Sequence, residues 1–309
     1  MIHKSCNLCR AKDTSLLFKG RDRFHSIPGT YHFVRCHQCG LMYLDPMPTS
    51  KELERHYPVD YIPYSKAIDD ETNLLTRWDR RYGMYKRYRV VTQVAGREPG
   101  RVLDVGCATG NFLDAMRRYG GWQPVGVEPN RQASIYARER LGLEVFTGTL
   151  EEAGFEDNSF DVVTMWDVLE HVTDPQATLQ EVARVLRIGG ILVMSLPNPE
   201  TWELGLFGSY WVGWDVPRHL HLFTCDVIAR YLEETGFELV KTTSFCGRYH
   251  VFLLSLDLWA RERCPRWRKA LMAVLKFWPV KLIGLVFFSI SDRIRMSSIM
   301  TVFARGVDK

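Results

Sequence analysis

The chain has 309 residues, of which 46% are hydrophobic and 25% are charged, as is typical of a globular protein with a full core. Its formal net charge of +4 at pH 7 is too small to indicate a nucleic-acid partner by itself. The first ten residues, MIHKSCNLCR, lack the apolar stretch of a secretory signal, so the expected compartment is the cytoplasm.

Two C-x-x-C units lie in the N-terminal segment that we assign to residues 1–50 as a zinc-binding unit. Their cysteines are Cys6, Cys9, Cys36 and Cys39. In a chain without a signal, close cysteine pairs indicate metal binding rather than disulfides, and two pairs complete a tetrahedral Cys₄ site. A hairpin within residues 14–33 can bridge the two cysteine pairs, and Gly40 suits the tight turn after the second pair. For one pair alone, a redox role is the alternative. We therefore predict a structural zinc ion that serves folding or positioning.

Residues 51–100 are expected to form a linker and a helical cover. Prolines punctuate the segment 43–64, which indicates an extended connection. A helix is expected over residues 76–95 and ends at Gly96. Its arginines and lysines form either a solvated basic face or a patch for an anionic partner, such as a phosphate, a nucleotide-sugar or a lipid headgroup.

The segment 101–129 carries the pattern around which the chain is organised. In order, it predicts a buried strand at 101–105, a small-residue turn at 106–110, a helix at 112–119 and a second strand at 125–127. A strand, a glycine turn, a helix and a strand that ends on an acid form a nucleotide-binding half-unit.

Two glycines and two carboxylates decide which nucleotide this unit would hold. A dinucleotide fingerprint reads G-x-G-x-x-G and faces a pyrophosphate, whereas Gly106 and Gly110 are spaced G-x-x-x-G. Asp104 would repel a pyrophosphate but suits a cationic ligand that carries an amine or a sulfonium. Glu128 can accept hydrogen bonds from both ribose hydroxyls. An ordinary turn between two strands, with no ligand, is the alternative.

This pattern resembles motif I of the class I S-adenosylmethionine-dependent methyltransferases, with Ala108 where many members have glycine. The resemblance covers residues 101–305 and implies a Rossmann-like α/β fold, in which a seven-stranded, mostly parallel sheet has an antiparallel last strand. It also implies S-adenosylmethionine as the cofactor. The cofactor-binding residues that it implies are Asp104, Gly106, Cys107, Gly110, Glu128, Pro129, Thr149, Leu150, Met165, Trp166 and Asp167.

The middle of the chain is expected to continue this alternation. Strands are predicted at 143–146, 160–165 and 191–196, and helices at 131–141 and 176–186, the second closed by Gly189 and Gly190. The segment WDVLEHV, after the strand 160–165, resembles sugar and quinone methyltransferases. His171 in it is either a general base or a structural histidine near a helix start. Residues 197–199 read P-N-P, not the N-P-P-Y of amino-methylating nucleic-acid enzymes, which argues against that class.

The connection 201–225 is rich in aromatic residues and glycine, and we expect it to cover the acceptor pocket. We expect His219 or His221 to deprotonate or orient the acceptor, while Arg218 holds an anionic group or Asp215. A rigid lid in which Arg218 and Asp215 merely pair is the alternative, and a metal site at the two histidines lacks an obvious third ligand. The predicted catalytic residues are thus His171, Asp215, His219 and His221.

The C-terminal part is expected to close the sheet. It comprises a helix at 226–235 and strands at 237–245 and 298–305. The insertion 247–296 between these strands is far longer than a hairpin needs. Lys276 and Lys281 interrupt its apolar stretch 271–290, so a membrane-spanning helix is not expected. Residues 261–291 are instead interpreted as an amphipathic element at a membrane surface, a dimer interface or a cap over the acceptor site.

These patterns together indicate a methyltransferase domain at residues 101–309. The expected acceptor is a small molecule: a sugar, a nucleotide-sugar, a lipid-linked glycan or another biosynthetic intermediate, with a role in polysaccharide biosynthesis. The N-terminal unit is similar to that of zinc-bearing sugar methyltransferases of deoxysugar pathways, whose additional C-terminal domain this sequence lacks. An RNA methyltransferase and a non-catalytic module that binds S-adenosylmethionine are the alternatives, and nucleic acid is not the expected partner.

Overall fold

The computed structural model of the chain describes residues 5–57, 67–96, 98–244, 248–293 and 296–308. Its main feature is a seven-stranded sheet in the order β10-β11-β8-β7-β4-β5-β6. The strands are β4 (Arg101–Val105), β5 (Gln123–Glu128), β6 (Glu144–Thr147), β7 (Phe160–Trp166), β8 (Leu186–Pro197), β10 (Phe237–Thr243) and β11 (Ile299–Gly306). β4 to β8 run parallel to one another, whereas β11 runs antiparallel to both β8 and β10. The predicted Rossmann-like sheet with an antiparallel last strand is confirmed.

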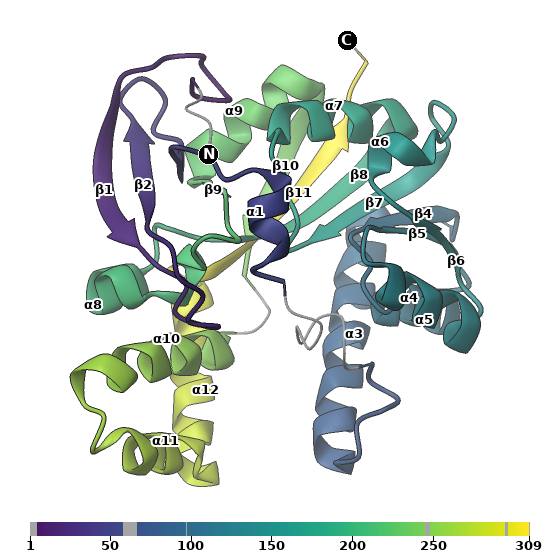
Figure 1. The fold of residues 1–309 in the computed structure, drawn as a ribbon. Coiled ribbons are helices and arrows are strands. Elements are labelled where there is room, and N and C mark those ends of the chain that lie inside the picture. Colours follow the sequence, from purple (N-terminus) through teal and green to yellow (C-terminus); the bar gives the residue numbers. More distant parts are fainter. Residues whose placement is uncertain (1–4, 58–66, 97, 245–247, 294–295, 309) are drawn as a thin grey trace.

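Helices cover both faces of this sheet (Figure 1). One face carries α3 (Leu74–Ala95), α4 (Asn111–Gly120) and α5 (Arg131–Leu141), and the other carries α6 (Leu150–Ala153), α7 (Pro175–Val185) and α9 (Cys225–Thr235). A hydrophobic core fills each side, with Val91 and Leu113 in the first and Leu179 and Ile228 in the second. Every residue of β7 is buried, because a central parallel strand is covered on both faces.

Capping residues explain where α7 begins and where α9 ends. The Asp174 side chain accepts a hydrogen bond from the Ala177 amide, and Pro175 occupies the first position of α7. α9 ends at Gly236, whose φ of 92° lies in the left-handed region that favours glycine.

A second, four-stranded sheet lies beside the first in the order β1-β2-β3-β9. Its strands are β1 (Thr14–Gly20), β2 (Tyr31–Cys36), β3 (Met42–Leu44) and β9 (His221–Leu222), and α1 (Ser50–Glu54) follows β3. β1 and β2 form the predicted antiparallel hairpin. β9 comes from the connection 201–225, so the N-terminal unit and this connection form one sheet, which the sequence did not predict. The rest of the connection forms α8 (Trp202–Phe207) and two short 3₁₀ turns (Gly208–Tyr210 and Val212–Trp214).

The start of β8 differs from our prediction. We expected Gly189 and Gly190 to lie in a turn before a strand at 191–196, but the strand begins at Leu186. Phe160 of β7 pairs with Leu186, and Val162 pairs with Ile191, so β8 advances by five residues while β7 advances by two. A bulge absorbs the excess, and Gly189 makes it feasible with a φ of 73°.

The predicted insertion between the last two strands is helical. It contains α10 (Arg248–Arg263), α11 (Arg268–Lys276) and α12 (Trp278–Arg293). The apolar stretch 271–290 is not one element, because the chain bends at Phe277 between α11 and α12. Figure 1 shows these helices projecting from the sheet beside α8.

Candidate active site

The turn between β4 and α4 is built around two glycines. Gly106 and Gly110 have φ angles of 70° and 76°. A Cβ at Gly106 would lie 2.7 Å from Val168 Cγ2, and one at Gly110 would lie 2.6 Å from Leu143 Cδ1. The positive φ angles favour glycine at both positions, and at Gly106 the contact with Val168 leaves no room for a Cβ unless Val168 shifts. Ala108, where the resemblance favours glycine, also has a positive φ of 47°.

Glu128 ends β5 directly beside this turn. Its side chain is almost fully buried and accepts hydrogen bonds from the amides of Ala108 at 2.8 Å and Asn130 at 2.7 Å. Burial raises the pKa of this carboxyl, and the two amides oppose that shift. Each oxygen keeps a second lone pair, so the carboxylate is fixed in place and can still accept bonds from two hydroxyl groups.

Asp104 lies on β4, just before the turn, and is 2% exposed. Thr164 Oγ1 donates a hydrogen bond of 2.6 Å to its carboxylate. Burial raises the pKa of Asp104 to about 7, although Thr164 and the positive charge of Arg87 oppose the shift. Arg87 belongs to α3, and its guanidinium lies 4.5 Å from the ring centre of Trp166. Sequence reasoning missed Arg87 because it is one of several basic residues on that helix.

Other predicted cofactor-binding residues are placed less directly. Met165 is fully buried in the core, and the Cys107 side chain packs so closely on Gly126 that a Cβ there would lie 2.6 Å from its sulfur. These two side chains therefore do not line a surface in this structure. Thr149 caps α6 through a capping box with Glu152.

The remaining predicted residues of this group lie at strand and helix ends. Leu150 is a buried residue of α6 and Pro129 is exposed after β5. Asp167 follows β7, is exposed, and accepts a hydrogen bond of 2.7 Å from Ser195 Oγ. Asp167 is thus placed at the carboxyl end of the parallel strands, where ligands of such sheets bind.

A cluster of titratable side chains lies beyond the end of β7. His171 and His219 have ring centres 4.7 Å apart, and His219 Nε2 lies 4.0 Å from both Glu170 Oε1 and Asp215 Oδ2. Three of the four predicted catalytic residues are therefore neighbours. Glu170 is fully buried, and neither carboxylate oxygen has a hydrogen-bond partner among the described residues. Burial raises its pKa well above the ordinary value, with Asp167 adding to the shift.

The two histidines of this cluster are oriented by backbone carbonyls. His219 Nδ1 lies 2.7 Å from the Gly213 oxygen, and His171 Nδ1 lies 3.0 Å from the Arg218 oxygen. A carbonyl can only accept, so each Nδ1 carries a proton and each Nε2 presents a lone pair in the neutral ring. Burial lowers the pKa of His219 and lowers that of His171 to about 3. The Tyr57 hydroxyl also contacts His171 Nδ1, at 3.0 Å.

This cluster also has the composition of a metal site. One atom each of Glu170, His171 and His219 lies within 4.8 Å of the other two. His221 does not take part, although we grouped it with His219. It lies in β9 next to β3, is 1% exposed, and its ring stacks on Tyr43 and Phe223.

Arg218 is held between two carboxylates. It is 1% exposed, and its guanidinium bonds Asp215 from the same connection and Asp22 from the N-terminal unit at 2.9 Å. Asp22 in turn bonds His56 Nδ1 at 2.8 Å. Of the two roles that we predicted for Arg218, the structure shows the pairing with Asp215. Asp215 is tied to Arg218, as in the rigid-lid alternative.

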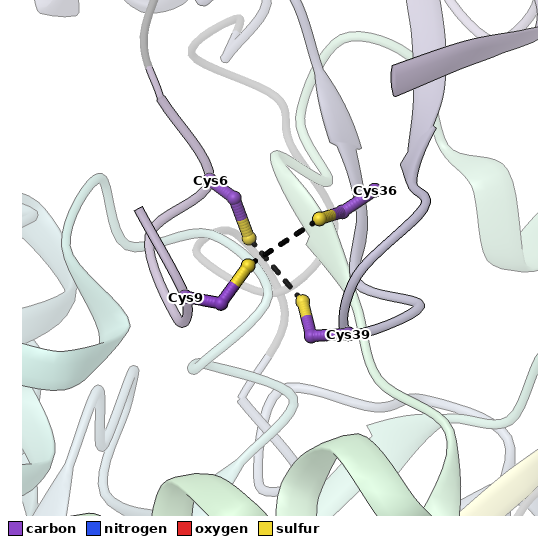
Figure 2. Close-up of side chains that lie close together, drawn as sticks. All are labelled: Cys6, Cys9, Cys36 and Cys39. Carbon is purple, nitrogen blue, oxygen red and sulfur yellow. Dashed lines mark hydrogen bonds between the residues drawn. The ribbon is translucent and has the colours of Figure 1, made fainter. Parts of the chain in front are cut away.

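The four N-terminal cysteines converge on one point (Figure 2). The sulfurs of Cys6 and Cys39 are 3.4 Å apart, as are those of Cys9 and Cys36, and all four lie within 4.8 Å of one another. These distances exclude disulfides. Four sulfurs about 2.3 Å from a tetrahedral zinc ion lie about 3.8 Å apart, so the cluster fits that ion.

The two cysteine turns are alike in their backbone. The Arg10 amide bonds the Cys6 carbonyl at 2.9 Å, and the Gly40 amide bonds the Cys36 carbonyl at 3.0 Å. Arg10 and Gly40 have positive φ angles of 62° and 80°. Gly40 therefore fits the tight turn that we predicted. Burial raises the pKa of Cys6 to about 11.

The first cysteine turn is bonded directly to the main domain. Asn7 Nδ2 donates to Asp174 at 2.9 Å, and Asn7 Oδ1 accepts from Tyr231 Oη at 2.9 Å. Arg10 donates to the Gln176 side chain at 2.8 Å. The cysteine unit thus holds the start of α7, which directly follows the segment that carries Glu170 and His171.

Comparison with known proteins gives a family and several relatives. The family described as "Methyltransferase domain" matches residues 79–242, more than half of the chain. The ubiquinone biosynthesis O-methyltransferase of Ruegeria sp. (strain TM1040) is 33% identical over 156 residues, which are 47% of this chain and 63% of that protein. That of Klebsiella pneumoniae (strain 342) is 34% identical over 128 residues, 39% of this chain and 53% of that protein. The chain thus covers less than two thirds of the length of either relative.

Solved structures resemble the chain over a larger share. The [4+2]-cyclase SpnF has a TM-score of 0.54 at 18% identity, over 85% of this chain and 98% of that one. The geranyl diphosphate C-methyltransferase from Streptomyces coelicolor A3(2) has a TM-score of 0.50 at 12% identity, over 81% and 90%. At these identities the likeness shows the fold. Since one of the two is named a cyclase, the fold alone does not decide the reaction.

Proposed function

The chain belongs to the methyltransferase domain family, and from that premise we propose that it transfers a methyl group from S-adenosylmethionine to a hydroxyl group of a small molecule. The observation that carries the proposal is the glycine turn between β4 and α4, flanked by the buried carboxylates Asp104 and Glu128. The turn gives close backbone approach, and Glu128 is fixed by two amides with lone pairs left for ribose hydroxyls.

The residues present fit S-adenosylmethionine better than a dinucleotide. Asp104 and Glu128 would place negative charge beside the turn, which opposes a pyrophosphate and favours a ligand with an amine and a sulfonium. When bound, S-adenosylmethionine supplies an electrophilic methyl carbon on a sulfonium and a neutral thioether as the leaving group. Gly106 and Gly110 would hold the nucleoside through the backbone, and Asp167 would face its methionine end from the end of β7.

We assign the role of general base to His219. The Gly213 carbonyl fixes the proton on Nδ1, so the Nε2 lone pair is available to take the proton of an acceptor hydroxyl. Asp215, 4.0 Å from Nε2 and kept ionised by Arg218, would stabilise the imidazolium that forms. His219 would take this proton as the acceptor oxygen becomes the nucleophile. His171, whose pKa burial lowers to about 3, is assigned a structural role.

The acceptor is proposed as a small molecule with a hydroxyl group. The relatives from Ruegeria and Klebsiella are named O-methyltransferases of ubiquinone biosynthesis, which favours a phenolic hydroxyl for this chain. The sugar and lipid-linked acceptors that we expected from the sequence are the second candidates. The comparisons give no support for a role in polysaccharide biosynthesis. The cysteine cluster is proposed to bind one structural zinc ion that takes no part in catalysis. The ion would fix the first cysteine turn, and Asn7 of that turn bonds the cap of α7.

A labelling experiment tests the proposal. The purified protein is incubated with methyl-labelled S-adenosylmethionine and fractionated cell extract, and label is followed into lipids, small metabolites and RNA. We expect label in a small metabolite or a lipid, and mass spectrometry of the labelled product distinguishes an aromatic ether from a methylated sugar. Label in RNA, or calorimetric binding of S-adenosylmethionine without any transfer, would overturn the proposal.

A pair of variants ties the activity to the site. Glu128→Ala removes the carboxylate that is expected to bind the ribose, and we expect both cofactor binding and transfer to be lost. Glu144→Ala, at an exposed position on the neighbouring strand β6, is the matched control and should bind as the parent does. Equal binding by the two variants would refute the assignment of Glu128.

A further inference from the structure

Two groups of large hydrophobic side chains are exposed on helices away from the catalytic cluster. The first, which we call the insertion tip, comprises Trp267, Val274, Phe277, Trp278, Leu282, Ile283, Val286 and Phe287 of α11, α12 and their flanks, each at least 52% exposed. The second, the α3 tip, comprises Leu74, Leu75, Trp78 and Tyr82, each at least 46% exposed. Single exposed apolar residues are ordinary, but two groups of this size on a protein surface mark an interaction site.

The two tips lie on the same side of the molecule. In Figure 1, the first turns of α3 and the helices α11 and α12 both extend downward from the sheet, as separate projections. An occupant that touches both must be broad and nearly flat. A bilayer surface has that shape.

The charge around the insertion tip is strongly positive. Between residues 261 and 281 the sequence has seven basic residues and one acid, Glu262. Glu262 already pairs with Arg21 at 2.9 Å and with Arg23 at 3.3 Å. Arg261 and Arg268 pair with Asp257 at 3.0 Å and 2.7 Å. The excess of positive charge that these two acids leave complements anionic lipid headgroups.

The aromatic residues at the tips also suit an interface. Trp267 and Trp278 are 72% and 67% exposed, and tryptophan favours the headgroup level of a bilayer because one edge is apolar and the other polar. Lys276 is exposed at the bend between α11 and α12, where a bilayer-spanning arrangement would bury it in hydrocarbon. Among the described residues no single helix is long and apolar enough to span; α11 and residues 278–288 reach that criterion only together, bent by 67°.

We propose that the insertion tip and the α3 tip dock together onto an anionic membrane surface, with their aromatic and aliphatic side chains in the headgroup region. This inference goes beyond the proposed methyl transfer and does not depend on it. The docked state places the molecule on the bilayer without crossing it, held by apolar burial and by the basic residues of the insertion.

Vesicle flotation tests the proposal independently of any catalysis. The full chain, loaded with zinc, is mixed with phosphatidylcholine vesicles that contain either no phosphatidylglycerol or 30 mol%, a composition on the order of anionic surfaces in cells. We expect the protein to float with the anionic vesicles only, and binding to fall at least tenfold when salt rises from about 0.05 to 0.5 M. Equal binding to both vesicle types, or to neither, would overturn the proposal.

Variants separate the two tips. Trp278→Asp with Ile283→Asp changes the insertion tip, Leu75→Asp with Trp78→Asp changes the α3 tip, and Ile188→Asp, at a 60% exposed position on the β8 bulge, is the control. Each tip variant should lose at least tenfold in vesicle binding, and the control should not. Circular dichroism verifies that each variant is folded. Unchanged flotation of either tip variant contradicts joint docking. A tip variant that changes a dimer into a monomer without changing vesicle binding also contradicts it and identifies that face as a self-association surface.

Discussion

Asp104 and Glu128 are buried to the same extent, but different groups satisfy their oxygens. Two backbone amides hold Glu128, whereas Asp104 receives one side-chain hydrogen bond from Thr164. The pKa of Asp104 is raised to about 7 by burial, so this group changes charge within the physiological range. Its ionisation should therefore be coupled to the binding of a cationic ligand.

This coupling predicts that cofactor affinity depends on pH. Asp104 is mostly neutral at pH 6 and mostly ionised at pH 8, and only the ionised form attracts a sulfonium or an amine. We expect the Kd for S-adenosylmethionine, measured by calorimetry, to fall about three- to tenfold between these pH values. In Asp104→Asn the affinity should stay near the pH 6 value throughout. A variant that retains the full pH dependence would show that another group is responsible.

The two histidines of the connection 201–225 should behave differently when replaced. His219→Ala removes the proposed base, so kcat should fall by about 10² to 10⁴, while calorimetric affinity for S-adenosylmethionine stays within about threefold. His221→Gln changes a side chain in β9 that packs on Tyr43 and Phe223, and kcat should stay within a few-fold. A larger loss of kcat in the folded His221 variant would reverse the assignment.

The same base predicts the shape of the pH profile. Burial lowers the pKa of His219, so the ring stays neutral and able to accept a proton at pH values below 6.5. The kcat of the parent protein should therefore decline only as the pH falls through this lowered value. An acid limb centred above pH 6.5 would be inconsistent with His219 as the base.

Sequence patterns identified some of these residues and missed others for a physical reason. The cysteines, Glu128 and the two turn glycines belong to motifs with a recognisable spacing, so the sequence reveals them. Glu170 is adjacent to His171 in the sequence, but the buried surroundings of its carboxyl form only when tertiary folding brings His219 and Asp215 near. Spacing carries no information about such a burial.

At the scale of elements, hydrogen bonds join the first cysteine turn to the start of α7. Asn7 bonds both Asp174, which caps α7, and Tyr231 of α9. The core on this side of the sheet continues from Leu8 and Val34 of the N-terminal unit into Leu179 of α7. We therefore expect that the N-terminal unit must be folded to hold the segment with Glu170 and His171 in position.

Removal of zinc should affect turnover more than cofactor binding. We expect about one zinc ion per chain by elemental analysis and a loss of several kcal/mol of stability in Cys9→Ser. Transfer activity should fall sharply, while calorimetric affinity for S-adenosylmethionine should change less, because Asn7 and Arg10 of the cysteine turn bond residues at α7 and α9. Cys264→Ser, between α10 and α11, is the control that keeps all four ligands. A fully active, zinc-free Cys9 variant would refute this coupling.

The elements that the sequence predicted poorly are those decided by long-range pairing. β9 has two residues, and only its pairing with β3 makes it a strand. The start of β8 was misplaced because Gly189 and Gly190 indicate a turn locally, whereas pairing with Phe160 extends the strand through them. The parallel strands β4 and β7 were predicted correctly, since their continuous apolar runs are local signals.

At the scale of the whole molecule, a buried ion network joins the N-terminal unit to the connection 201–225. Arg218 of the connection bonds Asp22 of the N-terminal unit and Asp215, and Asp22 also bonds His56. Burial works to raise the pKa of Asp22, but hydrogen bonds from Arg218, the His25 amide and His56 outweigh it and lower the pKa. The same balance lowers the pKa of Asp215, with Arg218 as the main opposing cause.

This network predicts a destabilised Asp22→Asn variant with an altered acid response. The side chains of Asp22 and Arg218 are 0% and 1% exposed, so the substitution leaves a buried charge with one partner fewer and should cost about 3–5 kcal/mol at pH 7. Because the folded-state pKa of Asp22 is lowered, its contribution is complete above the unfolded value of about 3.9 and is lost as pH falls through the folded value. In denaturant titrations the gap between parent and variant should therefore be constant from about pH 5 to 7 and narrow below about pH 4. Asp13→Asn, at an exposed position in the same unit, is the matched control. A difference in the free energy of unfolding that persists unchanged at pH 2.5 would mean that the lost stability arises from packing and not from the ion pair.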